Sequence, residues 1–314
     1  MLKPKVAVIG CGNVGMRYAH SLMIGGAARS IVIVDVDVER AEGEVLDLSS
    51  GMPYIVSPVE VSSGTYADIA GSDLVVITAG RKQSPGQTRM ALAKDNVDLF
   101  RRIVPEIVKH APDAVLLVVS NPVDVLSYAA YKFSGRPSGK VIGSGTVLDS
   151  GRLRWLLSCH CGVDARNIHA YMLGEHGDSE FPVWSRAMIG GILLDEYCPV
   201  CGKCDRGDLL EKISEEVRTF AYKVIERKGE TSYGIGLALV RITQAVLHDQ
   251  NSVLPVGCLV ADYYGINDVY MSLPAVVNRS GLRQILRPRL NDVEIGLLKK
   301  SAAEIRNVLD ECGL

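Results

Sequence analysis

The sequence lacks the features that mark membrane, exported and nucleic-acid-binding proteins. None of its apolar runs approaches the roughly 20 residues that a membrane-spanning helix needs. Lys3 and Lys5 precede only the short apolar run 6–9, which Gly10 interrupts, so we expect no signal peptide. The 34 Lys and Arg residues nearly balance the 36 Asp and Glu residues, which gives a formal net charge of −2. So small a charge provides no strong electrostatic footprint for nucleic acid or an anionic membrane.

Cysteine is too scarce for a disulfide scaffold, because the 314 residues contain only eight. Without an export signal, we expect a cytoplasmic protein in which most cysteines are reduced thiols. Cys198, Cys201 and Cys204 have a spacing that metal sites use, but a closed zinc site would need a fourth ligand. A redox-labile disulfide is a second option. We favour a loop of reduced thiols and predict no metal.

What the chain does contain is the composition of a globular protein, with 47% hydrophobic and 22% charged residues. Its first half alternates runs rich in Val, Ile and Leu with amphipathic helical patterns. The strand-like runs are 5–9, 30–34, 73–78, 114–119 and 140–142, and the helical patterns are 14–24, 38–48, 89–110 and 123–133. Such alternation predicts right-handed crossovers and a doubly wound parallel sheet, a Rossmann-type α/β fold, over residues 1–144.

The pattern changes after residue 144 to a mixture of helices and shorter strands. Helical patterns cover 147–161, 208–227, 233–247 and 291–311, and strand-like segments cover 167–172, 189–194, 253–260 and 269–277. No linker, repeat or low-complexity stretch separates the two halves. We therefore predict a second, mixed α+β domain over residues 145–314 that packs directly on the first.

A glycine-rich turn follows the first predicted strand and opens the first helix. Its residues are Gly10, Cys11, Gly12, Asn13, Val14 and Gly15. The first glycine permits a tight turn, the second lets a pyrophosphate approach the backbone, and the third lets helix and strand pack closely. Asp35 ends the second predicted strand, where a carboxylate can accept the ribose hydroxyls and would repel a 2′-phosphate. The turn therefore predicts a dinucleotide site for NAD rather than NADP, although Asp35 alone could be an ordinary turn residue.

Asp149, Arg152 and His176 have the chemistry of a reaction centre. Asp149 and Arg152 are three residues apart on a predicted helix, so they share a face, and the Arg152 guanidinium matches a carboxylate bidentately. His176 lies in the glycine-flanked segment 174–178, and a nearby carboxylate such as Asp149 would favour its imidazolium. An imidazolium can protonate a carbonyl oxygen while hydride arrives at carbon. Taken singly, the same residues could be a surface ion pair and a structural loop histidine.

The polar loop 79–89 follows the strand-like run 73–78 and precedes a long helix. Ligands of open α/β sheets collect at the carboxyl ends of the strands, which is where this loop begins. Its glycine and proline residues suggest a lid that closes over a substrate, although a plain connection is the alternative.

Five segments stand in a characteristic order along the chain, namely 10–15, 79–89, 120–124, 143–152 and 174–179. Through them the sequence resembles the NAD-dependent lactate and malate dehydrogenases over essentially its whole length. The resemblance implies that His176 is the proton donor and acceptor and that Asp149 orients it. It also implies that Arg152 binds the substrate carboxylate, that Arg89 polarises the carbonyl, and that Asn121 contacts substrate and cofactor.

Two residues favour the lactate branch of this family. Malate dehydrogenases meet the second carboxylate of oxaloacetate with a lid arginine, whereas this sequence has the neutral Gln83. An unpaired, desolvated carboxylate there would cost several kcal/mol. Thr231 is similar to the threonine that lines the methyl pocket of the lactate branch.

We therefore predict an oxidoreductase of glycolysis and fermentation that transfers hydride reversibly between NADH and pyruvate and forms L-lactate and NAD. Malate or longer 2-oxo acids are alternative substrates. A nucleotide-sensing or zinc-holding protein without catalysis is the non-enzymatic alternative.

Arg154 and His169 suggest a regulatory site. Arg154 points about 200° around the helix from Arg152, away from a substrate, and His169 lies on the strand that leads to His176. In the bacterial lactate dehydrogenases that this sequence resembles, an arginine and a histidine at these positions bind fructose 1,6-bisphosphate across a subunit interface. The resemblance therefore implies allosteric activation and a homotetramer. The alternative is that Arg154 is an ordinary interface residue and His169 a packed strand residue.

Overall fold

The structure, a computed structural model, describes residues 4–81, 88–201 and 206–314. Within these residues, nine strands form one sheet that runs through the molecule in the order β14-β13-β12-β6-β5-β4-β1-β2-β3. Two small sheets accompany it, one of three strands (β11-β10-β7) and one of two (β8-β9). No helix in the described ranges is both long and apolar enough to cross a membrane.

Six strands of the large sheet are parallel and come from the first half of the chain. They are β1 (Lys5–Ile9), β2 (Ser30–Val34), β3 (Glu60–Ser63), β4 (Leu74–Ile77), β5 (Val115–Val118) and β6 (Val141–Gly143). Their spatial order is β3-β2-β1-β4-β5-β6. The chain adds β2 and β3 on one side of β1 and then crosses back to add β4, β5 and β6 on the other side, as in a Rossmann fold. The predicted fold class is confirmed.

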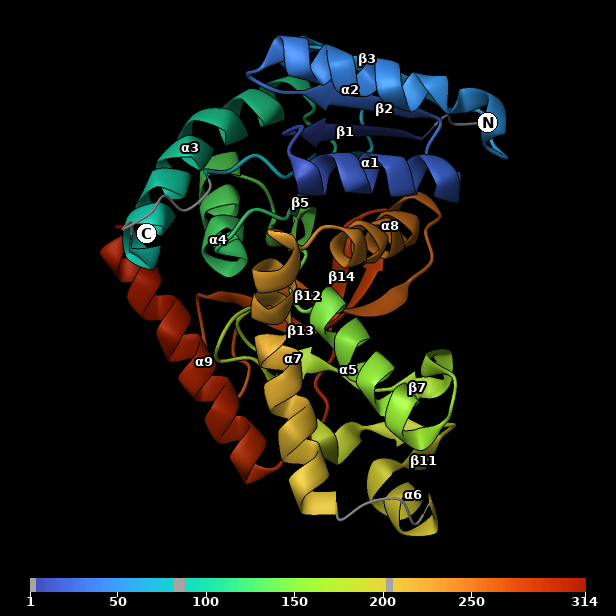
Figure 1. Cartoon of the computed structure of the whole chain (residues 1–314). Coiled ribbons are helices and arrows are strands. Elements are labelled where there is room, and N and C mark those ends of the chain that lie inside the picture. Colours follow the sequence, from blue (N-terminus) through green and yellow to red (C-terminus); the bar gives the residue numbers. More distant parts are fainter. Residues whose placement is uncertain (1–3, 82–87, 202–205) are drawn as a thin grey trace.

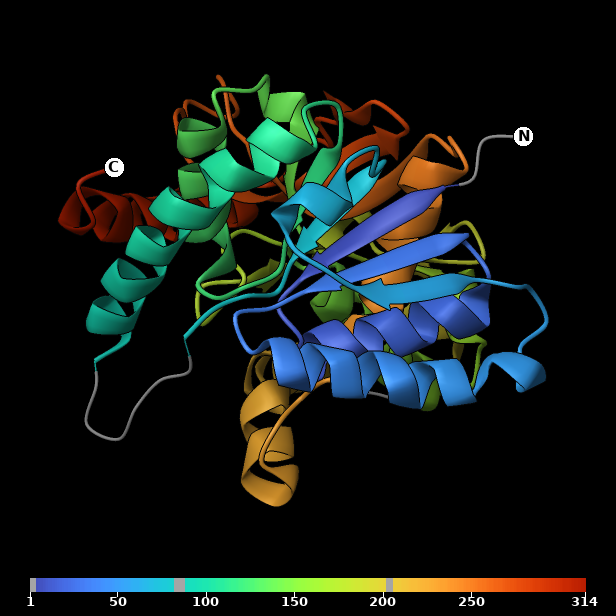
Figure 2. The same cartoon turned by 90° about the horizontal axis from the view of Figure 1, so that it is seen from above.

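Helices cover both faces of this parallel half (Figure 2). They are α1 (Asn13–Gly25), α2 (Val38–Ser50), α3 (Arg89–His110) and α4 (Val123–Ser134), and single 3-10 turns lie at Met52–Tyr54, Tyr66–Ile69 and Ser138–Lys140. Consecutive residues of β1 enter opposite layers, because Val6 packs in the core under α1 and Ala7 in the core under α3 and α4. Burial on both faces explains why these strands are continuously apolar in sequence.

The second half of the chain extends the same sheet instead of starting a separate one. Strands β12 (Ser252–Leu259), β13 (Tyr270–Asn278) and β14 (Gly281–Ile285) continue it in antiparallel fashion. Strand β12 joins β6 where Gly257 pairs with Gly143. A Cβ at Gly257 would lie 3.0 Å from the Gly143 Cα, so both glycines permit this contact. The two predicted domains therefore share one continuous sheet.

The remaining elements of the second half lie below strands β1, β2 and β3 in Figure 1. The helices are α5 (Val147–Cys161), α6 (Leu194–Cys201), α7 (Arg206–Lys228), α8 (Tyr233–Leu247) and α9 (Asp292–Glu311), with 3-10 turns at Ala165–Asn167 and Trp184–Arg186. The short strands are β7 (Ile168–His169), β8 (Met172–Leu173), β9 (Phe181–Pro182), β10 (Met188–Ile189) and β11 (Ile192–Leu193). Helix α8 packs against α1, where the buried hydroxyls of Tyr18 and Thr243 lie 2.7 Å apart.

The cysteine-rich segment begins in a helix and not in the predicted loop. Cys198 lies in α6, where its buried side chain belongs to an apolar cluster that includes Leu153 and Leu157 of α5. The α-helical spacing explains this difference, because Leu194 and Cys198, four residues apart, lie on the same side of α6 and both enter this cluster. The side chain of Cys201 and the whole of Cys204 lie outside the described residues, so the zinc and disulfide hypotheses are not tested.

Candidate active site

The glycine-rich turn lies between β1 and α1, at the carboxyl edge of the parallel strands. Gly10 has a φ of +110°, and a Cβ there would lie 2.6 Å from the Ala79 nitrogen. A Cβ at Gly15 would lie 2.2 Å from the Gly10 carbonyl oxygen, so only glycine lets α1 approach β1 this closely. A Cβ at Gly12 would have no atom within 4 Å. The open space at Gly12 is where a pyrophosphate can approach the backbone.

The start of α1 and the Asp35 side chain complete this cradle. Gly12 caps α1 without a side-chain hydrogen bond, so N–H groups of the first turn remain available to an anion. Asp35 accepts hydrogen bonds from the N–H of Cys11 (2.6 Å) and of Asp37 (3.0 Å). Partial burial raises the pKa of Asp35, but these hydrogen bonds outweigh burial and hold it below its usual value. The ionised carboxylate keeps free lone pairs for ribose hydroxyls, so the residues fit a dinucleotide.

A single buried carboxylate, Asp149, connects the other two candidate residues of the reaction centre. Its Oδ2 lies 2.7 Å from His176 Nδ1, and its Oδ1 accepts a hydrogen bond of 2.8 Å from Arg152. The Asp149 side chain is 2% exposed, whereas the His176 side chain is 27% exposed. The contact on Nδ1 leaves Nε2 as the only ring nitrogen that can face a substrate.

Charge interactions set the protonation of this cluster. Burial lowers the pKa of His176, but the charge and hydrogen bond of Asp149 outweigh it and raise the pKa to about 9. Burial likewise raises the pKa of Asp149, and its contacts with His176 and Arg152 hold it below the usual value. At neutral pH the site therefore contains an imidazolium and a carboxylate.

The backbone around His176 is held by two neighbouring elements. The His176 N–H donates to Asp124 Oδ2 of α4 at 2.7 Å, and the Glu175 N–H donates to Ser301 Oγ of α9 at 2.6 Å. Asp124 is buried, and burial raises its pKa to about 7. Asp124 belongs to the sequence segment 120–124, whose pattern predicts no contact for its carboxylate. The signal that could have found it is a carboxylate inside the apolar start of a helix.

Glu180 is a second carboxylate that the sequence analysis missed. One ligand atom from each of Asp149, His176 and Glu180 lies within 4.8 Å of the other two. The Glu180 side chain is buried, and burial raises its pKa well above the usual value. Nothing in the local sequence distinguishes Glu180 from an exposed loop residue, because its burial depends on α7 and α9, which are remote in the chain.

The predicted substrate residues are only partly described. Arg152 and Thr231 line one pocket of about 580 Å³ that α5, α7 and α8 form. Asn121 lies exposed between β5 and α4, and its carbonyl oxygen accepts a hydrogen bond from Asn96 (2.9 Å). Arg89 begins α3, but its side chain is not described, and Gln83 lies outside the described residues.

The two predicted regulatory residues lie on elements that pack against each other. Arg154 is half-buried on α5, where its Nε donates to the Ser150 carbonyl oxygen at 3.2 Å. His169 is exposed on β7 of the single chain, and β7 packs against α5.

Both halves of the chain match family models. Residues 4–143 match the lactate/malate dehydrogenase NAD binding domain, and residues 146–313 match the lactate/malate dehydrogenase alpha/beta C-terminal domain.

Curated relatives and solved structures match over nearly the whole chain. L-lactate dehydrogenase 1 of Clostridium acetobutylicum is 52% identical over 98% of this chain and 97% of its own length. L-lactate dehydrogenase of Acetivibrio thermocellus is 48% identical over 97% and 96%. The crystal structure of MGS-M5, a lactate dehydrogenase from a Medee basin deep-sea metagenome library, covers 100% of both chains with a TM-score of 0.97 at 42% identity. Minor L-lactate dehydrogenase of Enterococcus mundtii covers 98% of both chains with a TM-score of 0.95 at 39% identity.

Proposed function

Because the chain belongs to the lactate/malate dehydrogenase family, we propose that it transfers hydride reversibly between NADH and pyruvate, forming L-lactate and NAD. The predicted cofactor, NAD, and the predicted enzyme class, an NAD-dependent L-lactate dehydrogenase, are confirmed by the family match and the relatives. The observation that carries the proposed chemistry is the bridge that Asp149 makes between Arg152 and His176.

In the proposed mechanism, bound NADH supplies the hydride. Arg152 keeps one guanidinium nitrogen on Asp149 and presents the others to the substrate carboxylate. His176 donates its Nε2 proton to the carbonyl oxygen as the hydride arrives at carbon, and the neutral ring takes the proton back in the reverse reaction. Asp149 stabilises the imidazolium before the transfer. We assign carbonyl polarisation to Arg89 and contacts with substrate and cofactor to Asn121.

Substrate choice is assigned to Gln83 and Thr231. A neutral Gln83 gives the second carboxylate of oxaloacetate no partner, and Thr231 shares its pocket with Arg152, the proposed carboxylate anchor. The test is NADH oxidation by the purified protein with pyruvate, oxaloacetate or a longer 2-oxo acid. We expect a preference of about a hundredfold or more for pyruvate over oxaloacetate. Preference for oxaloacetate would overturn the lactate assignment.

We also propose activation by fructose 1,6-bisphosphate through Arg154 and His169. The half-buried guanidinium and the exposed imidazole lie on packed elements, and both are suitable phosphate ligands. Activity is measured against bisphosphate concentration for the parent chain and for Arg154→Gln. We expect Arg154→Gln to lose the activation. Arg166→Gln, a change at an exposed arginine, is the matched control and should keep it. Equal activation of both variants would contradict this assignment.

Self-association, expected as a homotetramer, is supported by an exposed apolar surface. Trp155 on α5 and Tyr233 and Leu237 on α8 are 51%, 60% and 66% exposed. Apolar side chains gathered in this way are typical of surfaces that a second subunit covers. Light scattering on the purified protein tests the proposal, and a monomer at all concentrations would refute it.

We assign the cofactor to residues 1–144 and substrate chemistry to residues 145–314. The cytoplasmic location stays a prediction.

A further inference from the structure

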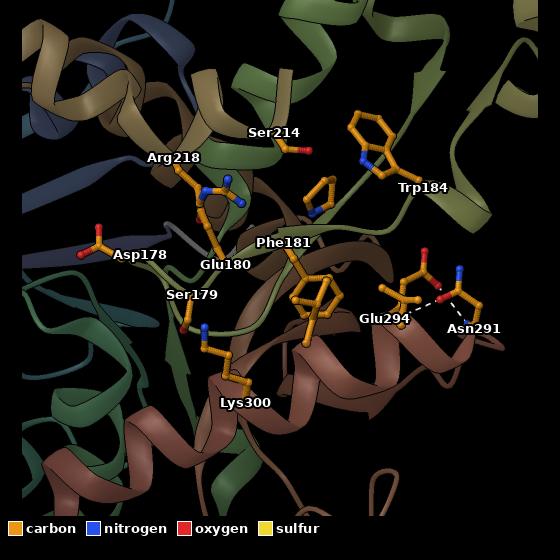
Figure 3. A pocket seen from close by; sticks show the side chains of 13 residues that line it. Asp178, Ser179, Glu180, Phe181, Trp184, Ser214, Arg218, Asn291, Glu294 and Lys300 are labelled. Carbon is orange, nitrogen blue, oxygen red and sulfur yellow. Dashed lines mark hydrogen bonds between the residues drawn. The ribbon is translucent and has the colours of Figure 1, made fainter. Parts of the chain in front are cut away.

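Glu180 separates the His176 cluster from a second pocket. This pocket has a volume of about 460 Å³ and lies between the loop after His176, α7 and α9 (Figure 3). Its polar lining includes Asp178, Ser214, Arg218 and Lys300. It shares no lining residue with the pocket that contains Arg152 and Thr231. Glu180 is therefore the residue that links this pocket to the reaction centre.

The Glu180 carboxyl is buried without a full set of partners. The residue is 4% exposed, and its Oε2 has no hydrogen-bond partner among the residues that the structure describes. Its carboxyl lies within 4.8 Å of ligand atoms of both Asp149 and His176, a separation that one water molecule can bridge. A buried carboxyl that lacks a fixed partner is costly unless it is protonated or serves a function.

Charged groups on three elements face Glu180. Burial and the Asp149 carboxylate on α5 favour its protonated form, whereas His176, Arg152 on α5 and Arg218 on α7 favour the ionised form. The side chains of Glu180 and Arg218 are directed toward each other (Figure 3). His176 and Arg218 thus stabilise the carboxylate and Asp149 stabilises the acid, an environment that suits a group that passes protons.

We propose that Glu180 relays protons from solvent in this pocket to His176. The inference rests on the proposed function, because each pyruvate reduced removes one proton from His176. In the relay, the Glu180 O–H bond breaks and its proton moves through bridging water to Nε2 of the neutral His176 ring, where a new N–H bond forms. The resulting carboxylate is stabilised by Arg218 and then takes a proton from a buffer acid or hydronium ion in the pocket. The step is a proton transfer without oxidation or reduction, and the Glu180 carboxyl ends in the protonated form from which it started.

The test compares proton uptake with NADH oxidation in stopped flow, using pyruvate and a pH-indicator dye in weakly buffered solution. In the parent chain we expect the two signals to coincide over successive turnovers. In Glu180→Gln, which keeps the shape but cannot carry a proton, we expect turnover after the first to slow about tenfold or more, with uptake lagging behind. Imidazole, a small acid that fits the pocket, should restore the rate in a saturable manner.

Glu294→Gln is the matched control, because Glu294 is an equally buried glutamate that lines the same pocket but is bonded to Ser185 and Asn291. It should show no lag. Coincident signals in Glu180→Gln, or the same lag in both variants, would overturn the relay. If Glu180→Gln does not fold, Arg218→Gln serves as the second variant and should show the same lag and the same rescue.

A second readout is independent of turnover. A protonated buried carboxyl gives an infrared C=O band, and the Glu180 band should appear in the difference spectrum between the parent chain and Glu180→Gln, in which the contribution of buried Asp124 cancels. If the band does not differ, Glu180 holds no proton and the relay fails. If the parent chain does not oxidise NADH with pyruvate, the proposed function fails separately, and the band still reports whether Glu180 carries a proton.

Discussion

The replacement Asp149→Asn removes the charge that keeps the His176 imidazolium stable while preserving the size of the side chain. The rise in the His176 pKa from 6.5 to about 9 corresponds to about 3 kcal/mol of preference for the charged ring. Burial alone lowers this pKa, so in the variant it should fall to about 6.5 or below. At pH 7.5 the protonated fraction would then drop from about 97% to about 10% or less.

The assay is the pH dependence of kcat/KM for pyruvate reduction, which reports the ionisation of the free enzyme. The decline on the alkaline side should lie near pH 9 in the parent chain and below about pH 6.5 in the variant. At pH 7.5 the loss of protonation alone gives about a tenfold decrease, and loss of the orienting charge adds to it.

Asp149→Asn should also lower the thermal stability of the protein, by an amount that depends on pH. Because the folded-state pKa of His176 is raised, the ion pair contributes fully below pH 6.5 and its contribution disappears as pH rises through about 9. The difference in Tm between parent and variant should therefore be larger near pH 6 than above pH 9.

Asp164→Asn is the matched control, because Asp164 is an exposed carboxylate that bonds Arg166 and is not among the groups that shift the pKa of His176. It should leave the profile of activity against pH unchanged. An alkaline limb that stays near pH 9 in Asp149→Asn would refute the assignment of His176 as the group that Asp149 keeps charged.

Three further substitutions test other parts of the molecule. Gln83→Arg should supply the missing partner for the second carboxylate of oxaloacetate. The kcat/KM for oxaloacetate, divided by that for pyruvate, should rise about a hundredfold or more. An unchanged ratio would show that Gln83 does not determine substrate specificity. Asp35→Ala removes the acceptor of the Cys11 N–H and the proposed ribose ligand. In a fluorescence titration, the Kd for NADH should rise about tenfold or more, and the difference between the Kd values for NADH and NADPH should become smaller. Tyr18→Phe removes a buried hydroxyl contact with Thr243 and should lower the free energy of unfolding by about 1–2 kcal/mol without changing kcat; no change in denaturant unfolding would show that this contact is dispensable.

Five of the six parallel strands could be predicted to within one residue at each end. Strands β1 and β2 have the predicted bounds, because burial on both faces leaves an uninterrupted apolar run. Strand β3 was missed, since it lies at the edge of the sheet and half of its residues are exposed. The predicted strand 189–194 is in fact the β10–β11 hairpin followed by α6, because Gly190 and Gly191 turn the chain with positive φ.

The reaction centre was predictable only where chemistry and local spacing coincide. Asp149 and Arg152 share a helix turn, so their contact follows from sequence separation, and the structure adds His176 to the same carboxylate. Asp124 and Glu180 gave no such signal, because their importance depends on tertiary packing that brings α4 and the loop after β8 together. Sequence patterns report which residues can do chemistry, whereas burial decides which of them are close enough to influence one another.

The junction of β6 with β12 also has a mechanical consequence. The main sheet continues from β6 into β12 through Gly143 and Gly257, and Gly174, two residues before His176, exchanges backbone hydrogen bonds with Ser272 of β13. The turn for the dinucleotide and the segment that carries His176 are therefore attached to the same sheet. A hinge between the two halves would have to break backbone hydrogen bonds in the middle of a buried sheet, which cost far more than a loop movement. We therefore expect the distance between the Gly12 turn and His176 to change little when small molecules bind.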